Sequence, residues 1–333
     1  MKRALALAVG LVLLAPAAAE AQDPAIPAPS PPPAVPAPPA PPPPPVPQIT
    51  LGAEKVHLAG DKALALRGRA YRVRGTMTPV AAVSQQVELR VLRSGKLART
   101  LRVAVAPDGS FVRRIPTWRK GGFGVRAVHV ATPELGAASG PKVKVRVVEP
   151  RLAEGSGGLL VPLLQQGLAK LRYAVSRSGS FDAATGRAVM AFRKVNGMAR
   201  SLDADRRVVE RVLAGKGAFK PRHPDAGRHV EADISRQVLA LIDGGEVVAT
   251  YHTSTGAPAT PTIVGDFRVY LKTPGSNSLG MLHSSYFIRG YAIHGFIDVP
   301  AFNASHGCLR LPIPDALRVF NWLRHGDRVI TYP

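Results

Sequence analysis

The sequence contains little cysteine and few acidic residues. Cys308 is the only cysteine among 333 residues, so no disulfide can form within the chain. Asp and Glu number 22 against 44 Lys and Arg, which gives a formal net charge of +22. A field of this sign attracts polyanions, including nucleic acids, anionic wall polymers and lipid surfaces. The basic residues form no block of five or more, so we interpret most of them as a solvated surface.

Long apolar runs are also missing. The run Ala4–Ala19 spans about 16 residues, fewer than the roughly 20 that a membrane helix needs. It follows the basic pair Lys2-Arg3 and ends in Ala19-Glu20-Ala21, a small-x-small pattern typical of a cleavage site. We therefore expect a signal peptide over 1–21 and an exported protein, with an uncleaved anchor as the alternative. Export excludes nuclear and ribosomal roles, so no nucleic-acid partner is predicted.

The next two segments differ in composition and periodicity. Residues 22–48 are dominated by proline and alanine, which predicts an extended polyproline II linker. Residues 49–150 alternate apolar and polar positions, with turn signals at Ser94-Gly95 and Asp108-Gly109. We expect a β-sandwich domain of the immunoglobulin-like type here. This domain contains no cluster of catalytic side chains, so we interpret it as a spacer or an interaction module.

Residues 155–215 change to helical periodicity and predict a small bundle of three helices. The inward positions of the first helix are Leu160, Leu163, Leu164, Leu168 and Leu171. The second helix is expected to begin at Asp182 or Thr185 and to end at Gly197. With Gln165 and the loop 179–182, the segment resembles the three-helix peptidoglycan-binding domain. A spacer bundle without a ligand is the alternative.

A basic linker over 216–227 leads to a mainly-β domain over 228–333. The turn Asp243-Gly244-Gly245 lies between two apolar runs and predicts a hairpin. Further strands are expected near Phe267–Leu271, Tyr286–Ile288, Ala292-Ile293 and Val329–Tyr332. One helix is expected over Ile313–Leu323, with an inward face of Ala316, Leu317, Phe320 and Leu323. The chain is therefore predicted to be multidomain.

The chemistry is concentrated in two short stretches. Ala292-Ile293-His294-Gly295 is followed by Ser305-His306-Gly307-Cys308-Leu309-Arg310. A nucleophilic thiol needs a base within reach, a lowered pKa and backbone donors for the developing oxyanion. His294 can supply the base, Gly307 and Cys308 the donors, and Arg310 a positive charge that favours thiolate. A structural histidine, an inert buried thiol or a metal site are the alternatives, although zinc normally takes three or four ligands.

These two stretches closely resemble the signature of the L,D-transpeptidase (YkuD-like) catalytic domain. Thr260-Pro261-Thr262 with Gly265 and Phe267 also resembles the strand entry of that family, with one extra residue. The resemblance covers about 228–333.

The resemblance implies a role for each residue. Cys308 is the nucleophile on a tetrapeptide stem of peptidoglycan and releases D-alanine. His294 is the base, oriented by the carbonyl of Gly295, and His306 shapes the oxyanion site with the backbone of Gly307 and Cys308. Arg310 supports the substrate site and Ser305 lines it. The amine of a second stem then resolves the thioester and makes a 3→3 cross-link. No metal or cofactor is implied, and carbapenems are expected to acylate the thiol.

Several other functions stay open at this stage. Water as acceptor would give an L,D-carboxypeptidase, and a lipoprotein amine as acceptor would give protein attachment. A non-catalytic wall-binding protein and a basic adhesin that binds anionic wall polymers through the sandwich are the alternatives from other classes. The intact set of His294, His306, Cys308 and Arg310 argues against loss of catalysis.

Overall fold

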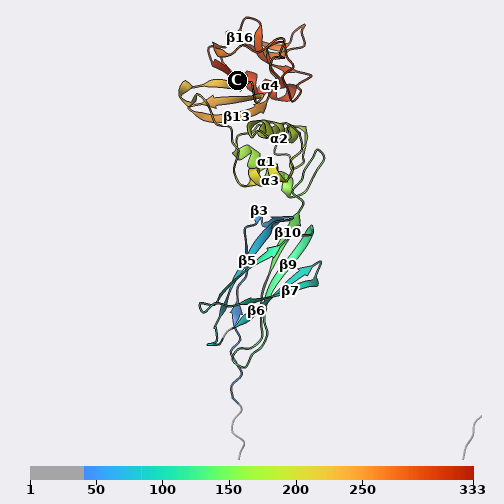
Figure 1. The fold of residues 1–333 in the computed structure, drawn as a ribbon, viewed down its shortest axis with the longest axis vertical. Helices are drawn as coiled ribbons and strands as arrows, with labels where there is room; N and C mark the ends of the chain where they lie inside the picture. The colour runs from blue at the N-terminus through green and yellow to red at the C-terminus, as the bar shows by residue number, and fades with distance from the viewer. Residues whose placement is uncertain (1–40, 84) are drawn as a thin grey trace, which may run out of the picture. The chain divides into compact units, whose positions relative to one another are not determined.

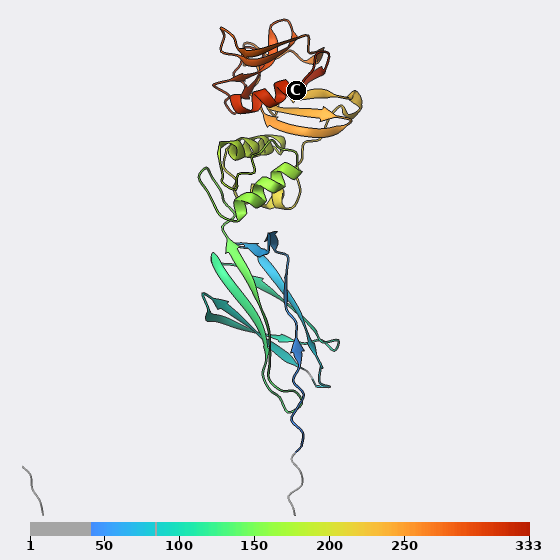
Figure 2. The same cartoon turned by 180° about the vertical axis from the view of Figure 1, so that it is seen from behind.

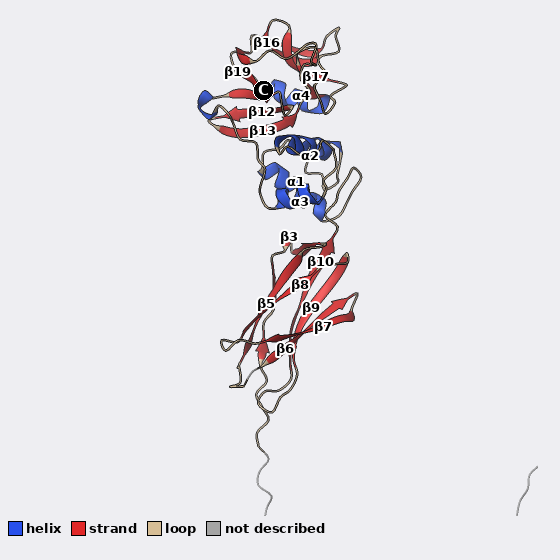
Figure 3. Cartoon of the chain, in the orientation of Figure 1, coloured by secondary structure: helices blue, strands red, loops and turns tan. Residues whose placement is uncertain are grey.

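The computed structural model describes residues 41–83 and 85–333. The predicted signal peptide and most of the proline-rich linker lie outside the described residues. Two regions rich in strands are separated along the chain by a helical region (Figures 1 and 3). No helix in the part of the chain that is described is long and apolar enough to cross a membrane.

The first region is formed by two sheets that share one core. Its strands are β1 (Gln48–Ile49), β2 (Gly52–Glu54), β3 (His57–Ala59), β4 (Lys62–Leu66), β5 (Ala70–Thr78), β6 (Gln86–Arg93), β7 (Lys96–Ala104), β8 (Ser110–Pro116), β9 (Gly121–His129) and β10 (Ala138–Val148). One sheet has the order β1-β5-β2 with β8 beside β5, and the other has the order β3-β4-β10-β9-β6-β7. Ser94-Gly95 forms the turn of the β6–β7 hairpin, as predicted, and Asp108-Gly109 lies in the turn that leads from β7 to β8 in the other sheet.

Alternation along these strands explains the core. Val87, Leu89 and Val91 of β6 are buried, and they meet Tyr71 and Phe111 from the other sheet. Each fully buried aliphatic side chain contributes about 1.5–3 kcal/mol relative to an exposed one. The expected two-sheet packing is therefore present. The immunoglobulin-like assignment stays a prediction.

Three helices follow, as the periodicity predicts: α1 (Leu160–Lys170), α2 (Ala183–Val195) and α3 (Arg206–Leu213). Asp182 caps α2 by accepting a hydrogen bond from the Thr185 N–H, and Asp205 caps α3 in the same way. Leu160, Leu164 and Leu168 of α1 are buried, whereas Leu163 is only partly buried and Val161 is buried in its place, so the inward face is rotated relative to the prediction.

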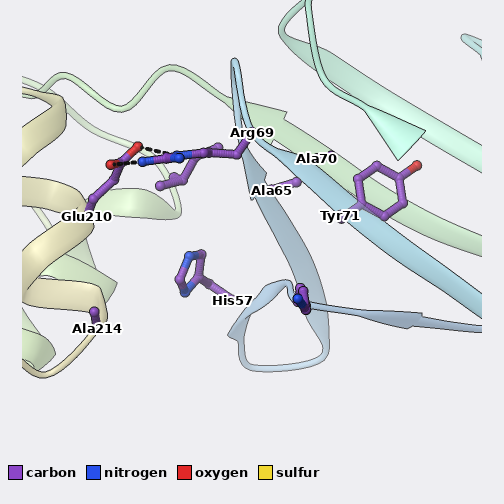
Figure 4. A pocket seen from close by; sticks show the side chains of 9 residues that line it. His57, Ala65, Arg69, Ala70, Tyr71, Glu210 and Ala214 are labelled. Atoms are coloured by element: carbon purple, nitrogen blue, oxygen red, sulfur yellow. Dashed lines mark hydrogen bonds and ion pairs between the residues drawn. The ribbon is translucent and has the colours of Figure 1, made fainter. Parts of the chain in front are cut away.

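An ion pair joins the sandwich to the helical region. Arg69 donates to the Glu210 carboxylate of α3 through two hydrogen bonds of 2.9 and 2.6 Å (Figure 4). A cavity of about 240 Å³ lies beside this pair, lined also by His57, Tyr71 and Ala214. Arg69 is exposed, so solvent screens the attraction within this pair.

The last region contains two sheets and one helix. Its elements are η1 (Pro224–Ala226), β11 (His229–Asp233), β12 (Val238–Asp243), β13 (Glu246–His252), β14 (Gly265–Arg268), β15 (Leu271–Ser276), β16 (Leu282–Ile288), β17 (Tyr291–Phe296), β18 (Leu309–Pro312), α4 (Ile313–Trp322) and β19 (Arg328–Tyr332). The sheet orders are β13-β12-β11-β19-β14 and β15-β16-β17-β18. Helix α4 contacts β16, β17 and β18, and Figure 2 shows the same region from behind.

Two sequence predictions for this region need correction, and one strand was not predicted. All of β11 is buried, whereas the alternation of Val230, Ala232 and Ile234 in the sequence predicts a strand with one buried and one exposed face. Val230 and Ala232 of this strand join the core, whereas the polar Glu231 on the other face accepts hydrogen bonds from the Tyr332 hydroxyl and from two backbone N–H groups of the preceding segment. Leu317 of α4 is 45% exposed, and Val319 is buried in its place. Strand β18 was not predicted, because Leu309–Pro312 is short and contains a proline.

Candidate active site

Two parallel strands position the predicted catalytic pair. In the β17–β18 ladder, Ile293 is paired with Leu309 and His294 with Arg310. Cys308 comes immediately before β18, so it lies in register with Ala292. Residues two apart on a strand share a face, which places His294 and Cys308 on the same face as diagonal neighbours. With strands about 4.8 Å apart and a rise of about 3.3 Å per residue, their Cα atoms are roughly 8 Å apart.

The Cys308 thiol is partly buried and protonated in the resting protein. Its Sγ atom lies 3.9 Å from the carbonyl oxygen of Gly290. Burial raises the pKa of the Cys308 thiol, and this effect outweighs the opposite influence of the Ala292 backbone and of Arg310. The prediction of a lowered thiol pKa is therefore wrong for the resting site. Arg310 favours thiolate as expected, but desolvation is the larger effect.

The His294 imidazole is buried and neutral. It is 3% exposed, and its Nδ1 lies 2.9 Å from the Gly295 carbonyl oxygen, the contact that the sequence predicts. A carbonyl only accepts, so Nδ1 carries the hydrogen and Nε2 has a free lone pair. Burial lowers the pKa of His294, and the positive charge of Arg310 lowers it further. The ring is thus ready to accept a proton near neutral pH.

An aromatic side chain connects the histidine to the arginine. Phe296 stands two residues after His294 on β17, and the two rings meet edge to face with centroids 5.8 Å apart. The guanidinium carbon of Arg310 lies 4.1 Å from the centre of the same Phe296 ring. This contact with the ring keeps the charge of Arg310 beside the site.

The loop before Cys308 departs from the predicted arrangement. Ser305 is 1% exposed, donates from Oγ to the Cys308 carbonyl at 2.6 Å and accepts from the Gly307 N–H at 3.1 Å. Ser305 therefore fixes the shape of the loop from inside instead of facing a substrate. The Gly307 N–H is occupied by this bond, so it is not a free oxyanion donor. The side chain of His306 is exposed.

Gly307 is required by close packing and by its backbone. Its φ is +109°, a region that favours glycine. A Cβ atom built there would lie 1.8 Å from Cε1 of Tyr291, so the tyrosine ring covers the glycine directly. Sequence reasoning found the glycine but not Tyr291, since this contact depends on strand pairing.

A polar platform over 253–262 supports the same loop. Thr262 donates to the Gly307 carbonyl at 2.9 Å and accepts from the Gly256 N–H at 2.9 Å. Thr260 donates to the Ser305 carbonyl at 3.0 Å. The motif Thr260-Pro261-Thr262 was noted in the sequence, but its supporting role was not. The hydroxyls explain it, because they satisfy carbonyls of an irregular loop.

No group of three or more His, Cys, Asp or Glu side chains suited to a metal occurs among residues 41–83 and 85–333. The N–H of Cys308 has no acceptor in this same part of the chain, so it is available to a developing oxyanion.

The region that contains His294 and Cys308 is similar to a known protein family. A family model described as the L,D-transpeptidase catalytic domain, YkuD, matches residues 227–331. The crystal structure of the L,D-transpeptidase (residues 123-326) from Xylanimonas cellulosilytica is 31% identical and covers 56% of this chain and 98% of that chain, with a TM-score of 0.51. Since 227–331 makes up only about a third of the chain, this similarity continues upstream of residue 227.

Two further structures are more distant. L,D-transpeptidase 1 from Mycobacterium tuberculosis is 25% identical and covers 32% of this chain and 62% of that chain, with a TM-score of 0.27. The catalytic domain of the Enterococcus faecium L,D-transpeptidase is 23% identical and covers 32% and 98%, with a TM-score of 0.28. The search of curated proteins gave no match. The family model and the Xylanimonas relative together establish that this chain belongs to the L,D-transpeptidases, which are acyltransferases.

Proposed function

We propose that the chain is a cysteine-dependent peptidoglycan L,D-transpeptidase that makes 3→3 cross-links through a thioester on Cys308. The observation that carries the proposal is the β17–β18 pairing, which puts a thiol and a neutral imidazole on one face of adjacent strands. The donor is a tetrapeptide stem and the acceptor is the side-chain amine of a second stem. The protein is proposed to act outside the cytoplasm, at the wall.

The first half-reaction is acylation. Sγ of Cys308 attacks the carbonyl carbon of the third stem residue, and the thiol proton passes to Nε2 of His294. The oxyanion that forms is held by the N–H of Cys308, with His306 of the same loop as the second group implied by the family resemblance. The C–N bond to D-alanine then breaks, and its amine takes the proton from His294. The product is a thioester and free D-alanine.

The second half-reaction transfers the acyl group. The acceptor amine attacks the thioester carbonyl and gives a proton to His294. The C–S bond breaks, and the leaving thiolate takes that proton back, which restores the resting thiol. Because the resting pKa of Cys308 is raised, thiolate is a transient species in this scheme. His294 therefore takes up a proton as sulfur attacks in the first half-reaction and as the acceptor amine attacks in the second.

Product analysis tests the proposal. We would incubate the exported chain with disaccharide-tetrapeptide and identify products by mass. A dimer with loss of one D-alanine supports transpeptidation, and a monomer with loss of D-alanine supports the L,D-carboxypeptidase alternative. Unchanged substrate, with a folded protein and a free thiol, supports a non-catalytic wall-binding protein.

The helical region is proposed to bind peptidoglycan, on the family resemblance of 155–215 and on the continued similarity upstream of residue 227.

One face of the six-stranded sheet of the sandwich is basic. Lys142 of β10 is paired in register with Arg126 of β9, which is paired in register with Arg90 of β6. All three are exposed, and Arg90 is paired with Glu88 at 3.1 Å, so Arg126 and Lys142 are the like charges that face one another at a cost to the sheet. An anionic partner would offset that cost.

The same face also contains a cavity. Lys144 is opposite Gly124 and Arg146 is opposite Gly122, so two cations flank strand positions that lack side chains. A cavity of about 450 Å³ is lined by both cations, both glycines, Lys142 and Lys62, together with one acidic residue, Asp61, so its charged lining is mainly positive. We therefore propose a phosphate-bearing anionic wall polymer as the partner of this face.

A further inference from the structure

A buried lysine of the helical region bonds to the catalytic domain. Lys194 on α2 is 3% exposed. Its Nζ donates to the Gln237 carbonyl at 3.1 Å and to the Thr253 carbonyl at 2.8 Å, and lies 3.0 Å from Nδ1 of His252. In its protonated form Lys194 only donates, so His252 accepts at Nδ1. All three partners lie beyond residue 227, in the matched catalytic segment.

One partner of Lys194 and the residue after it are hydrogen-bonded to β18, the strand that follows Cys308. Thr253 donates from Oγ1 to the Arg310 carbonyl at 2.6 Å. The next residue, Ser254, exchanges backbone hydrogen bonds with Arg310 at 3.1 and 2.9 Å. The Thr255 carbonyl then accepts the N–H groups of Ala304 and Ser305, both at 2.9 Å. Two hydrogen-bond steps thus connect Lys194 with the backbone on both sides of Cys308.

Gln237 adds a second connection to the same segment. Its side chain accepts from the Thr255 N–H at 2.8 Å and donates to Thr255 Oγ1 at 2.5 Å. It is not a glycine, yet its φ is +62°, a conformation that costs energy and persists only where the surroundings fix it. The bond from Lys194 to the Gln237 carbonyl is one of the contacts that fixes it.

Two arginines of the helical region contact other points around the site. Arg187 of α2 donates to the Asp315 carboxylate at 2.8 Å, in the first turn of α4 and just after β18. Arg200 donates at 2.7 Å to the Ala301 carbonyl, in the loop that leads to Cys308. Arg200 therefore contacts the segment before the nucleophile and Arg187 the segment after it. Lys194 contacts Thr253, whose neighbour Ser254 is bonded to the backbone of Arg310.

We propose that Lys194 and Arg200 are positioning residues that set the backbone geometry of the Cys308 loop, so that the helical region is part of the catalytic unit. This inference rests on the proposed acyl-transfer function and goes beyond a wall-binding role for the bundle. Neither side chain touches the reacting atoms. Each acts through a carbonyl of a segment that borders the loop.

The test measures two properties of Cys308 in the full chain. The first is the rate constant of acylation by a carbapenem, followed by intact-protein mass spectrometry. The second is the rate of alkylation by iodoacetamide as a function of pH. Displacement of reacting groups by about 1 Å can cost on the order of 100-fold, so we expect Lys194→Met to slow acylation by roughly 10- to 100-fold. Alkylation near pH 7 should become faster, because a loosened loop exposes the thiol.

Arg200 provides variants that keep the fold, since its side chain is exposed. Arg200→Met should slow acylation several-fold, and Arg200→Lys, which keeps a donor for the Ala301 carbonyl, should restore most of the rate. Arg207→Met is the matched control, because Arg207 is an exposed arginine on α3 with no side-chain hydrogen bond among the described residues. It should behave as the parent does. Melting temperatures are measured for every variant.

The outcomes separate the two proposals. If the parent chain is not acylated, the transpeptidase function fails, and the alkylation profiles alone decide the positioning role. If the parent is acylated, and Lys194→Met and Arg200→Met match it within about twofold in both properties, the positioning role is overturned. Should Lys194→Met fail to fold, the Arg200 pair and the Arg207 control decide the question.

Discussion

At the scale of single residues, the protonation states of Cys308 and His294 set the order of events. Burial raises the pKa of the thiol and lowers the pKa of the imidazole, so the resting pair is neutral on both sides. A preformed thiolate–imidazolium pair would need the opposite shifts. The site therefore supports general-base catalysis, in which the proton moves as the sulfur attacks.

The base predicts a specific kinetic result. His294→Ala should reduce kcat by roughly 10²- to 10⁴-fold, the usual contribution of a general base, with little change in KM. The measurement is release of D-alanine from a tetrapeptide substrate at neutral pH. Activity within a few-fold of the parent would remove His294 from the mechanism.

The raised pKa of the Cys308 thiol leads to a prediction for how its alkylation rate depends on pH. Iodoacetamide reacts with thiolate, and a raised pKa reduces the thiolate fraction at every pH below it. Alkylation of Cys308 should therefore be slower than that of an unperturbed thiol at pH 7, and should rise steeply only on the alkaline side of the free value of about 8.5. A midpoint below pH 7 would contradict the assigned protonation state.

The motif residues could be predicted from the sequence, whereas the residues that hold them in place could not. Cys308, His294 and the Gly295 carbonyl contact follow from one continuous pattern. Tyr291, Thr262 and Lys194 matter through contacts that strand pairing and helix packing create. Ser305 was predicted at the site, but its hydroxyl faces inward. No local pattern distinguishes an inward serine from one that lines a cleft.

At the scale of secondary structure elements, the helix caps and turn residues were the best guides. Asp182 begins α2 as predicted, because a carboxylate there satisfies a free N–H. Strand β18 was missed since its partner β17 is distant in sequence and its own pattern is too short. The catalytic register therefore came from the tertiary structure alone.

Helix α2 predicts a pH dependence of stability. Burial lowers the pKa of Lys194 to about 7 from 10.5, with Arg200 as a smaller cause, while the nearby His252 stays neutral with a pKa of about 3. Between pH 7 and 10.5 the unfolded chain binds one more proton at this site than the folded chain, so stability rises with pH.

The comparison with a neutral side chain isolates this effect. The difference in unfolding free energy between the parent and Lys194→Met should grow with pH by up to about 1.4 kcal/mol per unit across that window. Chemical denaturation at several pH values gives the difference directly. A difference that does not change with pH would show that Lys194 titrates normally.

The basic face of the six-stranded sheet predicts salt-dependent binding. Replacing Lys142, Lys144 and Arg146 by glutamine should weaken retention of the full chain on a phosphate-bearing wall polymer by more than tenfold at low salt. Exposed charge attraction is screened at about 0.5 M salt, where the parent and the variant should converge. Glutamine replacement of Arg113, Arg114 and Arg119, three exposed arginines outside the six-stranded sheet, removes the same charge and is the control. Equal loss in the control would mean that net charge alone explains retention.

At the scale of the whole molecule, the order of regions was readable from composition and periodicity. The mainly-β catalytic region and its family were predicted from the sequence and confirmed. The contacts of α2 with β12 and β13, and the bond from Arg200 to the Ala301 carbonyl, were not predicted, because they depend on packing between segments on either side of the linker 216–227. A fragment beginning at residue 228 would lack Lys194 and Arg200.

The most direct measurement is covalent capture at Cys308. Mixing the full chain with a carbapenem and recording the intact mass should show one adduct, since the chain has one cysteine. Peptide mapping should place it between Ser305 and Arg310, and Cys308→Ser should lose it. A folded chain with a free thiol that forms no adduct over hours would contradict the acyl-enzyme mechanism.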